Sequence, residues 1–135
     1  FSPLAQGMLT DKYLNGIPHD SRAARATGFL QESAITPEVV AKIRRLNELA
    51  KERNQTLAEM ALAWLLCKKV VTSVIVGARN SEQLLTNLKA LDNLEFSEYY
   101  NGSRAFSEME PVLREYFALI DKTSGLIPLF LNVFL

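Results

Sequence analysis

The stretch VIVGARNSEQLLTNL, residues 74–88, joins an apolar segment to a helix through one glycine and one arginine. The β-branched residues from 70 to 76 are typical of a strand that is covered on both faces. Asn80 or Ser81 is then expected to cap a helix that runs to about Leu91. A strand that leads directly into a helix is the building unit of α/β folds, so this stretch decides the expected fold class.

Two helices are predicted before this unit. Thr36-Pro37-Glu38 places a hydroxyl at the N-cap, proline at the first helical position and an acid in the first turn. The apolar residues that follow recur at helical spacing and predict an amphipathic helix over residues 37–54; they are Val39, Ile43, Leu46 and Ala50. Thr56 and Glu59 form a capping box, and the helix from Leu57 to about Lys68 is apolar nearly all round. We expect that second helix to be buried or packed on two sides.

The remaining segments complete the expected order of elements. Residues 1–5 are short and apolar and indicate the end of a strand, and residues 8–35 indicate a long loop with one helical turn near Leu9 to Tyr13. The order is therefore strand, helix, helix, strand, helix. Such alternation predicts parallel strands joined by right-handed crossovers, as in an α/β layer or barrel.

Composition excludes several classes of function. The 135 residues carry 15 basic and 15 acidic side chains, so no basic field is available to attract nucleic acid or an anionic membrane surface. Cys67 is the single cysteine, which excludes an internal disulfide and a cysteine-based metal cluster, and we expect it to be buried and unreactive. With no signal-peptide pattern and no apolar run near the ~20 residues of a membrane helix, we expect a cytoplasmic protein.

The turn at Gly77 is a candidate anion site. A strand that ends in glycine before a helix N-terminus presents backbone N–H groups and the positive end of the helix dipole. Gly77 allows a ligand to approach the backbone, and the guanidinium of Arg79 matches the geometry of a phosphate. Gln83 and Asn87 lie four residues apart and share one helix face. The alternative, equally open at this stage, is that these residues form a solvated turn and an ordinary polar helix face.

Two segments together resemble the aldo-keto reductase family. The first comprises FSPLAQGMLTDKY (residues 1–13), the Gly-Ile-Pro at 16–18 and Ser21-Arg22, which are similar to the end of strand seven and the loop after it. The second, residues 73–87, resembles strand eight and the phosphate-binding turn. The Ser-Pro-Leu-Ala and Gly-Ile-Pro segments are most similar to the branch that contains bacterial glyceraldehyde-3-phosphate reductases and potassium-channel β subunits. The resemblance implies that residues 1–98 are the last two β/α units of a TIM-type (β/α)8 barrel, followed by a divergent tail over residues 99–135.

The resemblance also implies NADP(H) as cofactor and assigns residues to it. Phe1 would stack on the nicotinamide ring, although it would otherwise pass for a core phenylalanine, and Lys12 and Arg22 would otherwise pass for solvated loop charges. Arg79 and Gln83 would lie near the 2′-phosphate that distinguishes NADP from NAD. Arg79 stands where this branch often has serine, and Thr86 replaces a usual glutamate. The expected cofactor-binding residues are Phe1, Ser2, Pro3, Leu4, Ala5, Gln6, Gly7, Lys12, Arg22, Gly77, Arg79, Gln83 and Asn87.

Catalytic residues are not expected in this chain. The family reduces carbonyl compounds by hydride transfer and uses an Asp, Tyr, Lys and His set from the first half of the barrel. We therefore expect part of an NADP(H)-dependent reductase that lacks catalysis by itself, with a small carbonyl substrate only in a full-length protein and oligomer formation left open. The alternatives are a nucleotide-binding or interaction module and a vestigial gene product. The isolated chain is expected to be marginally stable, because the helix over residues 57–68 would expose an apolar face.

Overall fold

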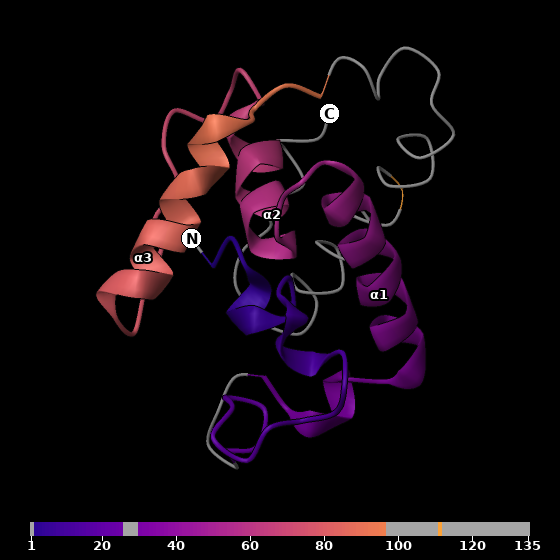
Figure 1. The fold of residues 1–135 in the computed structure, drawn as a ribbon. Coiled ribbons are helices and arrows are strands. Elements are labelled where there is room, and N and C mark those ends of the chain that lie inside the picture. The colour runs from indigo at the N-terminus through magenta and orange to yellow at the C-terminus, as the bar shows by residue number, and fades with distance from the viewer. Residues whose placement is uncertain (1, 26–29, 97–110, 112–135) are drawn as a thin grey trace.

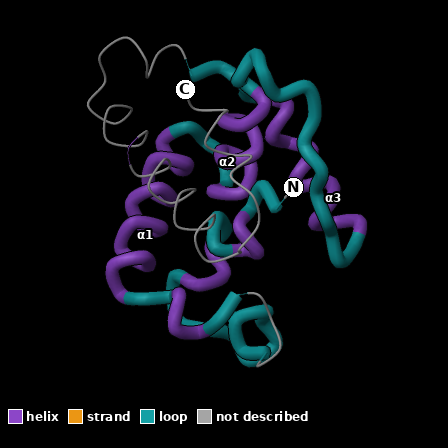
Figure 2. The backbone as a smooth tube through the Cα atoms, turned by 180° about the vertical axis from the view of Figure 1, so that it is seen from behind, coloured by secondary structure: helices purple, strands orange, loops and turns teal. Residues whose placement is uncertain are grey.

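The computed structural model describes residues 2–25 and 30–96, together with Pro111. Its α-helices are α1 (Pro37–Glu52), α2 (Leu57–Leu66) and α3 (Ser81–Leu88). Short 3-10 helices lie around them: η1 (Ala5–Gly7), η2 (Asp11–Tyr13), η3 (Glu32–Ala34) and η4 (Lys89–Asp92). Figures 1 and 2 show from opposite sides that α2 lies between α1 and α3.

Helix α1 begins and packs as its sequence predicts. The side-chain oxygen of Thr36 accepts a hydrogen bond from the backbone N–H of Val39 at 3.3 Å, and Pro37 occupies the first turn. The face formed by the predicted apolar residues is buried, with Ile43 and Ala50 fully inaccessible. Burial of one apolar stripe, rather than helix propensity alone, holds a helix of this length in place.

Helix α2 is the centre of the hydrophobic core. The predicted capping box is confirmed: Glu59 N–H donates to Thr56 Oγ1 at 3.2 Å, and Thr56 N–H donates to Glu59 Oε2 at 2.7 Å. Trp64 is only 1% exposed, and its apolar neighbours on every side of the helix are buried as well. The expectation that this helix would expose an apolar face is therefore wrong for the described residues, because α1 covers one side of α2 while α3 and η4 pack on another.

A buried arginine connects the turn between α1 and α2 to the end of the described chain. Arg53 is 6% exposed and donates through Nη1 to the Glu95 carbonyl at 2.8 Å and through Nη2 to the Asn93 carbonyl at 3.2 Å. Its Nε donates to Gln55 Oε1 at 2.9 Å, and its guanidinium lies 3.7 Å from the centre of the Phe96 ring. A planar group with five donors suits such a junction of carbonyl groups. Arg53 thus fixes the segment that follows η4 against α1 and α2.

The two predicted strands are not present among the described residues. Near the N-terminus, Ser2 and Ala5 have φ angles of 54° and 51°, in the left-handed region, and the chain turns into η1 instead of extending. Residues 71–78 form no regular element, although Val74 and Val76 pack against the core while Ile75 is 75% exposed. A strand needs a neighbouring strand to complete its hydrogen-bond ladder, and the described residues offer none. Residues 74–76 thus alternate between packed and exposed side chains, as in a strand, but form no hydrogen-bond ladder with a neighbouring strand.

Helix α3 leaves an apolar face exposed. Asn80, one of the two residues proposed as the cap, caps this helix, and the 3-10 turn η4 carries the chain on to Asp92, close to the expected end. Four leucines on α3 and η4 are between 43% and 62% exposed; they are Leu84, Leu85, Leu88 and Leu91. We call them the α3 apolar face. Exposed apolar groups at this spacing are unusual on a domain that works alone.

The predicted tail, residues 99–135, lies outside the described residues except for Pro111, as does the expected domain boundary at residue 98. Within the described residues, no helix is long and apolar enough to cross a membrane.

Candidate functional site

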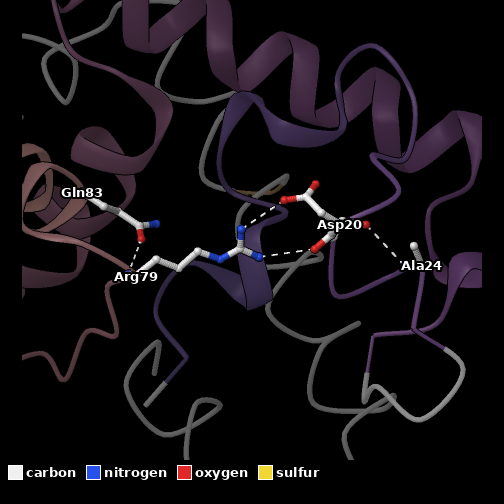
Figure 3. Close-up of polar contacts among 5 residues, drawn as sticks. Asp20, Ala24, Arg79 and Gln83 are labelled. Carbon is white, nitrogen blue, oxygen red and sulfur yellow. Dashed lines mark hydrogen bonds and ion pairs between the residues drawn. The ribbon is translucent and has the colours of Figure 1, made fainter.

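The N-terminal turn of α3 is organised by its own side chains. Asn80 Oδ1 accepts from the backbone N–H of Gln83 at 2.8 Å, and Gln83 Oε1 accepts from the backbone N–H of Arg79, also at 2.8 Å. These two bonds satisfy part of the free donor set at the helix start and fix the backbone on which Arg79 stands. The Arg79 side chain then extends away from the helix, as Figure 3 shows.

Arg79 reaches a residue that is 59 positions away in the sequence. Its Nη1 lies 3.2 Å from Asp20 Oδ2, and its Nη2 donates to the Asp20 backbone carbonyl at 3.4 Å (Figure 3). The arginine side chain is 58% exposed and the aspartate 72% exposed. The pair therefore lies at the surface, where solvent and ions can reach both partners.

Lys12 acts on the same carboxylate. The hydrogen bond from Arg79 is the main reason that the pKa of Asp20 lies below its ordinary value, and the positive charge of Lys12 lowers it further. Lys12 belongs to η2, whose cap is Thr10, and Thr10 accepts from the Lys12 backbone N–H at 3.1 Å. Arg79 thus contacts the Asp20 carboxylate directly, and Lys12, from a distant part of the chain, adds positive charge that favours the ionised carboxylate.

Residues 2–7 form a compact turn whose backbone donors serve its own structure. Ala5 N–H donates to the Ser2 carbonyl at 2.8 Å, and Gly7 N–H donates to the Leu4 carbonyl at 2.9 Å. Gly7 has φ +100°, which a residue with a Cβ rarely adopts. Pro3 and Ala5 are buried, whereas Ser2, Leu4, Gln6 and Gly7 are half-buried. Phe1 lies outside the described residues.

The other predicted residues are not gathered at the anionic position by any contact seen here. Arg22 and Gly77 are exposed. Asn87 is only 6% exposed, and within the described structure its Nδ2 has no hydrogen-bond partner. Gln83 and Asn87 were predicted to share a face, but Gln83 is exposed while Asn87 is buried near the end of α3 that leads into η4. A helix that meets the core at one end only separates the two residues in this way.

Sequence reasoning missed Asp20. Its local sequence, Pro-His-Asp-Ser, is that of an ordinary polar turn, and His19 beside it is exposed as expected. The one indication in the sequence was that Asp20 is an acidic residue in the same loop as two basic residues, Lys12 and Arg22. Nothing local indicates a contact with Arg79. In the described part of the chain, no three His, Cys, Asp or Glu side chains are grouped so that they could hold a metal ion.

Comparison with known proteins covers most of the chain. The profile of the Aldo/keto reductase family matches residues 1–103. The chain is 51% identical over 102 residues to an L-glyceraldehyde 3-phosphate reductase of Escherichia coli O157:H7, covering 72% of this chain and 29% of that protein. It is 40% identical over 94 residues to a probable voltage-gated potassium channel subunit beta of Oryza sativa subsp. japonica, covering 68% of this chain and 29% of that protein. The chain thus spans less than a third of the length of these curated relatives.

Proposed function

Because this chain belongs to the aldo/keto reductase family, we propose that it binds NADP(H) and forms the cofactor-binding part of an NADP(H)-dependent oxidoreductase. The family has a (β/α)8 barrel, of which this chain would supply the last two units. The relatives include a reductase whose name specifies a phosphorylated aldehyde, so a small carbonyl compound is the proposed substrate class of a longer protein.

The convergence of Lys12 and Arg79 on one anionic position is the observation that carries this proposal. Arg79, which contacts the Asp20 carboxylate directly, immediately precedes Asn80, the N-cap of α3. The chain's own carboxylate, Asp20, pairs with Arg79 there, which supports an anion as the partner of this guanidinium. A 2′-phosphate carries more charge and three acceptor oxygens, and the fork of Arg79 can pair with two of them.

The fit to the whole cofactor is uneven along its length. The phosphate end suits Lys12, Arg79 and the helix terminus. At the adenine end Asn87 would have to become accessible, since its side chain is buried in the described structure. Residues 2–7 would hold the pyrophosphate through side chains and outer surface, because the N–H groups of Ala5 and Gly7 are already bonded. When bound, the cofactor would supply the hydride, and the residues named here would hold and orient it.

We propose that carbonyl reduction does not occur on this chain alone. No residue here is assigned to the family's proton-donating tyrosine or to its lysine, aspartate and histidine partners. The charged residues proposed here, Lys12 and Arg79, would instead hold the cofactor's phosphates.

A second candidate function, an interaction module, is favoured by the α3 apolar face. Four leucines that water would otherwise surround, together with the exposed Ile75 on a segment without a strand partner, would be covered in an assembly. The proposed occupant is a polypeptide that supplies the remaining β/α units of a family barrel. Mixing this chain with such a polypeptide should give a stable 1:1 complex in size-exclusion chromatography, and separate elution would contradict it.

An NADPH titration tests the leading proposal. Binding should be followed by the fluorescence of NADPH and by quenching of Trp64, the single tryptophan. We expect saturable binding that Arg79→Ala weakens about tenfold, since a charge-assisted hydrogen bond to phosphate is lost. Arg45→Ala, which removes an exposed arginine of α1, is the matched control and should change nothing. No response from protein that is folded by circular dichroism, or equal affinities for the two variants, would refute the proposal.

A further inference from the structure

The anionic position between Lys12 and Arg79 is filled by the chain itself. Both terminal nitrogens of the Arg79 guanidinium face Asp20, one toward its carboxylate at 3.2 Å and one toward its backbone carbonyl at 3.4 Å (Figure 3). A phosphate that pairs with the same two nitrogens needs the same space. The two anions therefore compete for one fork.

The ion pair between Asp20 and Arg79 can separate without unfolding of the loop. The Asp20 side chain is 72% exposed, and the loop that carries it is held nearby by the Ser21 N–H, which donates to the Pro18 carbonyl at 2.9 Å, and by burial of Ser21 itself. Rotation of the aspartate side chain thus releases Arg79 Nη1 while Ser21 stays anchored, and Nη2 keeps only its longer contact, 3.4 Å, to the Asp20 backbone carbonyl. An exposed ion pair is also weak enough for a multiply charged ligand to displace.

From these contacts we propose that Asp20 is an intramolecular competitor that admits only ligands with a phosphate strong enough to displace it from Arg79. This inference rests on the proposed binding of NADP(H) and adds a specificity-determining residue to it. NADP carries the 2′-phosphate that replaces Asp20. NAD carries a hydroxyl at that place, which leaves the ion pair intact and gains nothing from Arg79.

Four variants, compared with the unchanged protein and with Arg79→Ala, separate this competition from a structural role of Asp20. Asp20→Asn removes the competing charge, and Asp20→Glu keeps a charge in the same loop. Glu48→Gln removes a carboxylate from another exposed ion pair, Lys51–Glu48 on α1, and serves as the matched control. The double variant Asp20→Asn with Arg79→Ala removes both the competing carboxylate and the guanidinium fork.

Dissociation constants for NADPH and NADH should be measured by isothermal titration calorimetry at fixed salt. Loss of an exposed ion pair predicts that Asp20→Asn tightens NADPH binding about two- to five-fold. The affinity for NADH should not change, and neither Asp20→Glu nor Glu48→Gln should alter either ligand beyond twofold. In the Arg79→Ala background, the effect of Asp20→Asn should fall below twofold.

The failure of this inference differs from the failure of the proposed function. NADPH binding that Asp20→Asn leaves unchanged or weakens would overturn the competition and leave cofactor binding standing. Equal tightening of NADPH and NADH would overturn the selectivity for a phosphate. Absence of NADPH binding to every one of these proteins, each folded by circular dichroism, would overturn both.

Discussion

Replacement of Arg53 by alanine should be among the most damaging single substitutions in the described core. The change removes the donors of three hydrogen bonds, to the carbonyls of Asn93 and Glu95 and to Gln55 Oε1, and removes the cation from the face of Phe96. Hydrogen bonds from a charged donor contribute about 1.5–3 kcal/mol each, and their losses overlap because they share one group. The free energy of unfolding should therefore fall by about 3 kcal/mol.

Urea unfolding followed by Trp64 fluorescence measures this loss, because Trp64 is the single tryptophan and lies buried in α2. With a urea slope of roughly 1.5 kcal/mol per M, the midpoint should move down by roughly 2 M. Arg53→Lys should lose about half as much, since an ammonium keeps the charge without the planar fork. Lys51→Ala, which breaks an exposed pair with Glu48, should cost less than about 1 kcal/mol. An Arg53→Ala protein no less stable than the Lys51→Ala control would show that the Arg53 contacts do not stabilise the fold.

Three further predictions follow from other described contacts. Thr56→Ala removes one half of the capping box of α2 and should lower the free energy of unfolding by about 1 kcal/mol in the same urea assay; an unchanged midpoint would count against the cap. Leu85→Lys should reduce concentration-dependent self-association in sedimentation velocity, whereas Glu48→Lys on α1 should not. Equal self-association of the two variants would mean that the α3 apolar face does not mediate it. Burial raises the pKa of the Cys67 thiol, so less thiolate exists at a given pH, and reaction with a disulfide reagent at pH 8 should be slower than in urea; equal rates would contradict this.

Helix starts were the features that could be predicted most directly from the sequence. Thr36, Thr56 and Asn80 each cap a helix as predicted, because a capping side chain and the N–H it bonds lie within three residues of each other. The buried stripe of α1 was accessible for a similar reason, since its period appears in 16 consecutive residues. Such information is local, and distant parts of the chain need not be known.

Features that depend on contacts between distant residues could not be predicted from the sequence. Residues 70–76 have the composition of a strand, yet a strand forms only beside another, and residues 2–5 turn into η1 instead. The buried position of Asn87 depends on where α3 meets the core, and the pairing of Asp20 with Arg79 joins residues 59 positions apart. Arg79 itself was predicted as an anion ligand from its place after Gly77. Only the structure adds that an acidic residue of the chain already faces it.

Amide NMR spectra of ¹⁵N-labelled protein during addition of 2′,5′-ADP test phosphate binding at Arg79 directly. This probe carries the distinguishing phosphate without the nicotinamide. We expect saturable shifts centred on the amides of Lys12, Asp20 and Arg79 through Gln83, and much smaller shifts with 5′-AMP. Shifts centred on the α3 apolar face, or equal shifts with both nucleotides, would contradict it.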